Sequence, residues 1–227
     1  MALASVPMIP VAKRLPSRAR LEGRHAMRWL RSRLRLMPGR SVVAIDGLAG
    51  AGKTCFADEL AELLSEGGLA TMRISLDAYG LSDCYSGPIA TVEGAATPSD
   101  WFLEDVLEPV RGAGSGRYRT AVADGSGSPR WACVGDRTVV LVDGRYLHGP
   151  PFCSSTGDSV WDLSVWLDVP MGLAYQRLHL EQGDRPHRRS AVGHADRSTQ
   201  VRYLRECGPA SRADLVVENW RPHQPID

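Results

Sequence analysis

The feature that most constrains the fold of this chain is Gly47-Leu-Ala-Gly-Ala-Gly-Lys53-Thr54, which satisfies the pattern G-x-x-x-x-G-K-[ST] in full. The run SVVAID at residues 41–46 precedes it and is rich in β-branched and apolar residues, which predicts a buried strand. Residues 54–66 follow it, and their leucines at helical spacing predict a helix. A strand, a glycine-rich turn and a helix in this order predict a loop that binds phosphate.

The residue types in this loop match the chemistry of an anion site. Glycines adopt dihedrals that other residues avoid, so the N–H groups of the loop can approach phosphate closely. The N-terminus of the following helix adds partial positive charge. Lys53 supplies a full charge to the outer phosphates, and Thr54 offers a hydroxyl to Mg²⁺. The residues expected to hold a nucleotide are therefore Gly47, Leu48, Ala49, Gly50, Ala51, Gly52, Lys53, Thr54 and Cys55.

Apolar strands alternate with helices along the rest of the chain. Further strands are predicted at residues 70–76, 138–142, 163–168 and 213–218, and further helices at residues 19–36, from residue 98 or 99 through 107, 172–182 and 198–207. Residues 80–97 and 111–130 are rich in turn-forming residues and predict irregular structure. This alternation predicts an α/β fold of the P-loop NTPase type, with a parallel sheet flanked by helices on both faces.

The chain length of 227 residues suits one compact domain. We expect a domain at residues 41–227 and a basic N-terminal extension at residues 1–40 that contains one helix. From Lys13 to Arg40 arginines are frequent and Glu22 is the only acid. This run is typical of a solvated helix face with a flexible arm, and an arm that binds RNA or an anionic surface is the alternative. An Arg-rich, acid-poor start is also found in mitochondrial transit peptides.

Composition argues against several other classes of protein. The formal net charge is +1, which favours neither nucleic acid nor membrane as a partner. The five cysteines form no CxxC pair, and the histidines form no HExxH motif, so neither a disulfide framework nor a zinc site is expected. The sequence has no apolar run long enough to span a bilayer, and its start lacks the order of a secretory signal, so we expect a cytoplasmic protein. The sequence has no N-K-x-D element, which a regulatory GTPase is expected to use to bind guanine. It also has no G-x-S-x-G motif, which argues against a serine hydrolase.

Two acidic residues follow predicted strands at the edge where α/β proteins bind ligands. Asp77 follows the strand at residues 70–76, where its carboxylate could accept the proton of an attacking hydroxyl. Asp143 follows the strand at residues 138–142, where it could hold Mg²⁺ through water. The alternatives are a cap or turn after the strand for Asp77 and a turn-forming Asp-Gly for Asp143.

Between about residues 42 and 219 the chain resembles the uridine kinase family of P-loop kinases, whose relatives include phosphoribulokinase and pantothenate kinase. The resemblance is strongest in VVAIDGLAGAGKT and RISLDAY, and PSDWF, VVLVDG and DLSVWLD are similar to further elements of the family. It implies a kinase that uses ATP and Mg²⁺ to phosphorylate a hydroxyl of a small molecule. It also implies that Asp77 is the general base and that Tyr79 is the aromatic residue of the family motif.

The family has an arginine-bearing lid, which corresponds to residues 177–197 of this chain. Phosphoryl transfer needs positive charge around the transferring group, and a mobile lid can bring it there. Arg177 and Arg185 are the first candidates, and Arg188 and Arg189 follow them. For any single arginine, a solvated position is the alternative.

The chain departs from the family at the residues that bind the nucleoside. Ala96 and Thr97 stand where an aspartate usually precedes the PSDWF-like element, and the usual Tyr-Asp followed by a histidine is absent. Tyr118 and Asp124 lie in the corresponding loop at a different spacing, where they could contact the acceptor or serve packing and turns. A nucleoside such as uridine, a sugar, a vitamin precursor and an antibiotic all remain open as acceptors.

Two other functions remain open. One is a nucleotide-binding regulator without a small-molecule acceptor. The other is an ATPase associated with nucleic acid through the basic stretch, which would show steep salt dependence.

Overall fold

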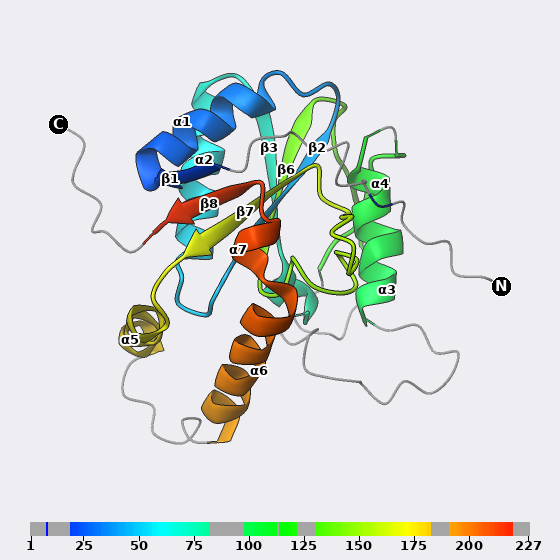
Figure 1. Cartoon of the computed structure of the whole chain (residues 1–227). Coiled ribbons are helices and arrows are strands. Elements are labelled where there is room, and N and C mark those ends of the chain that lie inside the picture. Colours follow the sequence, from blue (N-terminus) through cyan, green and yellow to red (C-terminus); the bar gives the residue numbers. More distant parts are fainter. Residues whose placement is uncertain are drawn as a thin grey trace.

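A six-stranded parallel sheet forms the centre of the molecule, in the strand order β1-β8-β7-β2-β6-β3 (Figure 1). The computed structural model describes residues 8, 19–81, 98–112, 114–121, 130–182 and 191–219. The strands are β1 (Ala19–Glu22), β2 (Ser41–Gly47), β3 (Ala70–Ser75), β6 (Thr138–Gly144), β7 (Leu163–Asp168) and β8 (Leu215–Glu218). Every residue of β2 and β6 is buried, which explains why these central strands read as continuous apolar runs.

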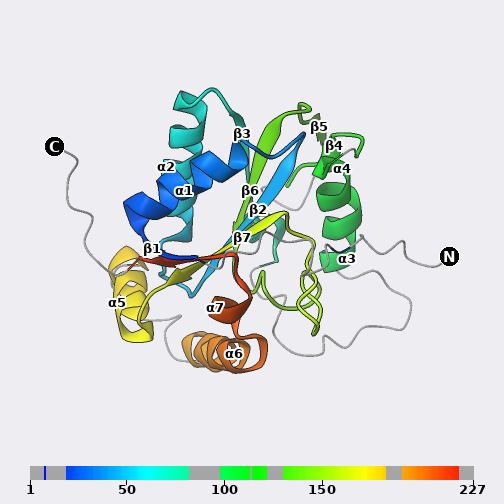
Figure 2. The same cartoon turned by 45° about the horizontal axis from the view of Figure 1, so that its top comes forward.

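Helices cover both faces of the sheet, as the sequence predicts (Figures 1 and 2). One face carries α1 (Gly23–Leu34) and α2 (Lys53–Glu66). The other face carries α6 (Ala191–Cys207), α7 (Pro209–Arg212) and a helix made of α3 (Pro98–Phe102), the π-helical turn η3 (Leu103–Leu107) and α4 (Glu108–Val110). The helix α5 (Met171–Gln182) follows β7 at its carboxyl end. Right-handed crossovers between parallel strands produce this division of helices between the two faces.

The register of the sheet brings several strand ends to one edge. Asp143 of β6 pairs with Ile45 of β2 and with Ser75 of β3, and Gly47 pairs with Leu167 of β7. The carboxyl ends of four strands therefore surround the start of the glycine-rich loop. This edge is the ligand-binding edge of open α/β sheets.

The predicted helix at residues 19–36 is divided in the structure. Residues 19–22 form β1, which pairs in parallel with β8, and α1 begins only at Gly23. The edge of β8 offers unpaired backbone groups, and the N–H of Ala19 reaches the carbonyl of Asp214 at 3.2 Å. Strand pairing of this kind overrides the helical periodicity of the sequence. The described part of the expected N-terminal extension is therefore built into the central sheet and its hydrophobic core.

Other elements also differ from the sequence-based expectation. Within the segment expected to be irregular, β4 (Arg117–Arg119) pairs antiparallel with β5 (Trp131–Cys133). The helix α6 begins at residue 191 instead of 198, and the last strand begins at residue 215 because the short helix α7 precedes it. Gly208 at φ 52° followed by Pro209 accounts for α7, since proline is well suited to the first turn of a helix.

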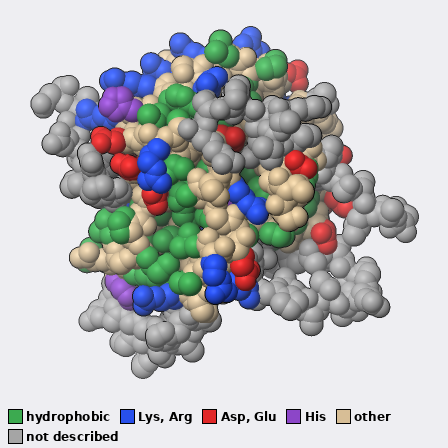
Figure 3. All heavy atoms as spheres, in the orientation of Figure 1, with side chains coloured by type: hydrophobic (Ala, Val, Ile, Leu, Met, Phe, Trp, Pro, Cys, Tyr) green, Lys and Arg blue, Asp and Glu red, His purple; other side chains and the backbone are tan. Residues whose placement is uncertain are grey.

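The outer surface is basic over α1, where Figure 3 shows Lys and Arg side chains along the upper edge of the molecule. The arginines Arg24 and Arg28 of α1 are exposed, whereas Met27 and Leu30 are buried against the sheet. No helix in the described part of the chain is long and apolar enough to cross a membrane.

Candidate active site

The glycine-rich loop connects the end of β2 to the start of α2. Gly50 and Gly52 adopt left-handed backbone conformations with φ of 77° and 85°, and Gly52 is the residue before the first turn of α2. A Cβ at Gly50 would collide with the carbonyl oxygen of Ala174, because the backbone of α5 lies directly against the loop. Glycine is therefore required at position 50 by its conformation and by this close approach.

Lys53 is folded back onto the loop. Its Nζ donates to the carbonyl oxygens of Gly47 at 3.2 Å and Leu48 at 3.0 Å. Burial lowers the pKa of Lys53; the charge of Asp46 opposes this shift and that of Arg145 adds to it, while Asp77 and Asp143 act in the same direction as Asp46. The ammonium group thus lies within electrostatic reach of three carboxylates and one guanidinium.

A fully buried carboxylate, Asp46, supports the first residue of the loop. Its Oδ1 accepts hydrogen bonds from the N–H groups of Gly47 and Tyr146, at 2.7 and 3.1 Å. Its Oδ2 accepts from the N–H of His148 at 3.2 Å and the Tyr203 hydroxyl at 2.5 Å, and it lies 2.8 Å from Nδ1 of His148. Burial of a charge is costly unless hydrogen bonds replace those of water, and this set of donors does so. Burial and then the charge of Asp46 raise the pKa of Tyr203 well above its usual value, so the hydroxyl remains a donor.

Asp143 lies at the end of β6 beside the start of α2. Its side chain is 3% exposed, with Oδ2 at 3.5 Å from Thr54 Oγ1 and Oδ1 at 2.7 Å from Nη2 of Arg73. Arg73 also pairs with Asp58 of α2. A hydroxyl and a carboxylate that converge at the end of a phosphate loop are oxygen ligands of the kind that Mg²⁺ takes together with phosphates and water. The two side chains therefore fit a magnesium ion.

Asp77 lies in the short 3₁₀ helix η2 (Leu76–Tyr79), which follows β3 at its carboxyl end. Its side chain is exposed, while Tyr79 is half-buried and donates from its hydroxyl to the carbonyl oxygen of Arg119 at 3.0 Å. The ring of Tyr79 lies 5.7 Å from that of Trp101 and 5.2 Å from that of Phe102. Burial raises the pKa of Tyr79 to about 12. Tyr79 thus anchors the segment that presents Asp77.

No protein-family model matches the sequence, and no curated protein matches it significantly. Among solved structures, the chain is similar to a possible uridine kinase from Bacillus stearothermophilus, with 18% identity, a TM-score of 0.56, and coverage of 86% of this chain and 98% of that one. It also matches a protein from Silicibacter sp. TM1040 described as a fructose transport system kinase, with 21% identity, a TM-score of 0.49, and coverage of 86% of this chain and 98% of that one. Shikimate kinase from Acinetobacter baumannii matches with 15% identity, a TM-score of 0.40, and coverage of 86% of this chain and 89% of that one. The fold is an α/β fold of the P-loop NTPase type. The first likeness confirms the predicted fold class, and the resemblance to uridine kinase-like proteins extends to the arrangement of sheet and helices.

The structure brings Lys53, Thr54, Asp77 and Asp143 to one edge of the sheet. The other predicted residues are more scattered. Arg177 of α5 donates to the carbonyl oxygen of Asn219 at 2.9 Å. Tyr118 of β4 is half-buried and packs against the hydrophobic cluster beneath α3. Arg185 and Asp124 lie outside the described residues, so their predicted roles stay predictions.

Sequence reasoning missed four residues around the loop: Asp46, Arg145, Gln200 and Asn219. Asp46 had a usable signal, since it is the only charged residue in an apolar strand that reads as fully buried. Arg145 directly follows the Asp143-Gly144 pair that ends β6, and it could have been noted there. Gln200 accepts the N–H of Ala49 at 3.0 Å, and Asn219 donates to the carbonyl oxygen of Ala51 at 2.8 Å. Nothing in the sequence around the last two residues indicates a contact with the loop.

Proposed function

We propose that this protein is an ATP-dependent kinase that transfers the γ-phosphoryl group to a hydroxyl of a small molecule. One observation carries the proposal: the phosphate loop with Lys53, the pair Thr54 and Asp143, and the exposed carboxylate of Asp77 lie at the one edge of the sheet where β2, β3 and β6 end. An exposed carboxylate beside the phosphate loop supports the proposal, because it could accept the proton of an acceptor hydroxyl.

The roles follow from position and chemistry. The amides of the loop and the N-terminus of α2 bind the phosphates, and Lys53 adds charge where the outer phosphates lie. Thr54 and Asp143 would hold Mg²⁺, which neutralises phosphate charge when bound. Asp77 orients the acceptor hydroxyl and takes its proton as the new bond from oxygen to the γ-phosphorus forms and the bond to the β-phosphate oxygen breaks, releasing ADP. Arg177, with Arg185 and its neighbours, would add charge around the transferring group.

The acceptor is proposed only as a class, a small molecule with a hydroxyl group. A nucleoside such as uridine is the first candidate, because the chain resembles uridine kinase-like proteins in RISLDAY and has their fold. Tyr79 holds Asp77 next to an aromatic cluster that includes Trp101, and this cluster suits an acceptor with a planar ring.

The test is ADP release from MgATP with a panel of acceptors, starting with nucleosides and continuing with sugars, pantothenate and hydroxylated antibiotics. ADP release that depends on one acceptor, together with its phosphorylated product by mass spectrometry, is the expected result. ADP and free phosphate released at a rate that no acceptor changes would reject the kinase and favour the regulator. Stimulation by RNA or DNA would favour the nucleic-acid ATPase. Truncations should end at residue 18, because β1 belongs to the sheet.

A further inference from the structure

The inner face of α6 contacts the phosphate loop through two polar side chains, Gln200 and Tyr203. Both residues are 1% exposed, and their spacing of three places them on one face of the helix. Gln200 Oε1 accepts a hydrogen bond from the N–H of Ala49 at 3.0 Å. The hydroxyl of Tyr203 donates to Asp46, which also accepts the N–H of Gly47. The helix is thus bonded to the start of the loop at two points.

The bond to Gln200 involves the peptide unit that joins Leu48 to Ala49. The N–H of this unit points to Gln200, and its carbonyl oxygen accepts a hydrogen bond from Lys53 Nζ at 3.0 Å. A trans peptide directs its N–H and C=O groups to opposite sides. Gln200 and Lys53 therefore hold the same planar unit from its two sides, and a rotation of the unit would break both bonds.

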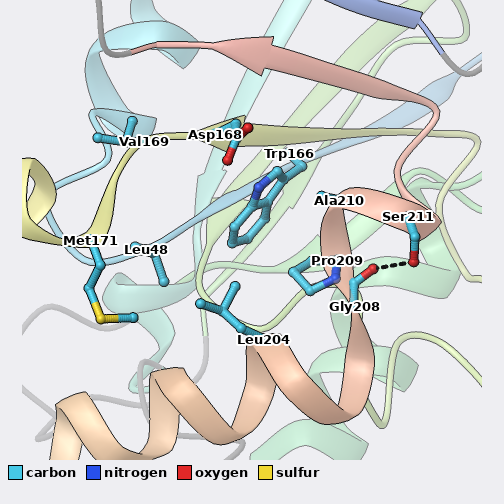
Figure 4. A pocket seen from close by; sticks show the side chains of 10 residues that line it. All are labelled: Leu48, Trp166, Asp168, Val169, Met171, Leu204, Gly208, Pro209, Ala210 and Ser211. Carbon is cyan, nitrogen blue, oxygen red and sulfur yellow. Dashed lines mark hydrogen bonds between the residues drawn. The ribbon is translucent and has the colours of Figure 1, made fainter.

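The Leu48 side chain is buried in the hydrophobic core, and the Leu48 carbonyl oxygen also accepts the N–H of Ala51 at 3.0 Å. A cavity of about 310 Å³ adjoins Leu48, and Trp166, Leu204 and Pro209 line other parts of its wall (Figure 4). On the carbonyl side of the unit, Ala51 and Lys53 both donate to the Leu48 oxygen. On its amide side, the N–H of Ala49 bonds to Gln200, so Gln200 fixes that side of the unit.

We infer that Gln200 is a positioning residue that fixes the 48–49 peptide, so that the Leu48 carbonyl holds the ammonium group of Lys53 where the nucleotide phosphates bind. The inference rests on the proposed function in one respect, namely that the loop binds a nucleotide. Gln200 itself acts through the peptide and through Lys53, and it needs no contact with the phosphates. The helix α6 thereby takes part in arranging the loop that lies far from it in sequence.

The experiment uses the full chain with Lys13→Arg, because Lys13 and Lys53 are the only lysines in the sequence. Labelling with ¹³C,¹⁵N-lysine then gives one side-chain Nζ signal, which reports on Lys53 without any ligand. Gln200→Met removes the acceptor at similar volume, and Gln200→Glu keeps an oxygen acceptor. The matched control is Val201→Ala, on the same helix at a side chain that is 45% exposed. Binding of MgADP is measured at one salt concentration for all variants, and Gln200→Glu is judged by the Lys53 signal, because salt does not screen a buried charge.

In Gln200→Met we expect the Lys53 signal to move and the dissociation constant of MgADP to rise about tenfold, the effect of losing one good hydrogen bond. The Lys53 signal of Gln200→Glu should stay closer to that of the parent protein than the signal of Gln200→Met does, and Val201→Ala should match the parent protein in both measurements. A folded Gln200→Met protein with an unmoved Lys53 signal and unchanged MgADP binding would overturn the inference.

Two further measurements keep the outcomes distinct. If the parent protein binds no MgADP, the proposed function loses its nucleotide site, and the Lys53 signal alone then decides the role of Gln200. If Gln200→Met does not fold, hydrogen exchange at the Ala49 amide of the parent protein decides it. Slow exchange there supports the bond to Gln200, and exchange as fast as in an unstructured peptide refutes it.

Discussion

The two sides of the ligand-binding edge are built differently. On the phosphate side, Asp46 and Asp143 are buried and hydrogen-bonded. The backbone of α5 lies against the loop there, and α6 accepts a hydrogen bond from it. On the acceptor side, Asp77 is exposed on a 3₁₀ helix of four residues, and a half-buried tyrosine secures that helix. The charges on the first side are thus hydrogen-bonded inside the fold, whereas the charge on the second side lies at the surface.

This difference separates stability from chemistry. A buried carboxylate that satisfies backbone N–H groups, as Asp46 does, holds the fold together, and its removal costs several kcal/mol of stability. An exposed carboxylate at a strand end contributes little to stability and is available to accept a proton. Substitutions on the two sides should therefore give opposite patterns of stability and turnover.

The largest effect is expected for Asp77→Asn. Turnover should fall by about 10² to 10⁴, the usual contribution of a general base, because the amide cannot take the acceptor proton. The urea midpoint and the affinity for MgADP should stay as in the parent protein, since the side chain is exposed. Steady-state kinetics with the acceptor found in the panel, together with calorimetry, checks both. Normal turnover in this variant would remove Asp77 from the mechanism.

Asp46→Asn should give the reverse pattern. The NH₂ group of the asparagine is a donor and would face groups that are themselves donors. We therefore expect a loss of about 3 kcal/mol or more in the free energy of unfolding. Asp58→Asn is the matched control, because Asp58 is an acid whose side chain is 58% exposed in a surface pair with Arg73. Its effect should stay within about 1 kcal/mol. Equal urea midpoints for the two variants would contradict the comparison between the two sides.

The two sides also differ in how far the sequence predicted them. The phosphate loop was predicted well because all its elements are contiguous: a strand, a glycine turn and a helix occupy residues 41–66. The support beneath it was missed because Asp46 collects donors from His148 and Tyr203, which only the fold brings together. Sequence periodicity carries no signal for such contacts.

The errors in secondary structure have the same origin. Residues 19–22 read as helix because the local pattern favours one, and the free edge of β8 made them a strand. The hairpin of β4 and β5 has only three residues in each strand, which is too short for a period of two to stand out. On the acceptor side, Asp77 and Tyr79 were found through a motif, but the contact of Tyr79 with Arg119 depends on that unpredicted hairpin.

Gly50→Ala tests how closely the phosphate side is packed. Alanine there meets a left-handed backbone and the carbonyl oxygen of Ala174, so α5 must move away from the loop. Gly68→Ala is the control, because Gly68 has a similar φ of 78° and open space around it. The control should lose about 1 kcal/mol from backbone strain alone, and Gly50→Ala should lose more and also bind MgADP more weakly. Equal losses with unchanged MgADP binding would show that α5 does not restrict the loop.

The smallest expected effect is the pH dependence of MgADP binding, which tests whether Lys53 on the phosphate side contacts the phosphates. Burial lowers the pKa of Lys53 in the free protein, and bound phosphates favour the ammonium form. The free protein therefore loses this proton at a lower pH than the complex with MgADP. The dissociation constant should rise with pH above the lowered pKa, by at most tenfold for each pH unit, and level off once the complex also loses its proton.

Calorimetric titrations between pH 7 and 10 measure this, with Lys53→Met as the control whose weaker binding should not follow the same curve. A flat profile for the parent protein would mean that the phosphates do not meet Lys53, and the buried side of the edge would then lose its proposed role in binding them.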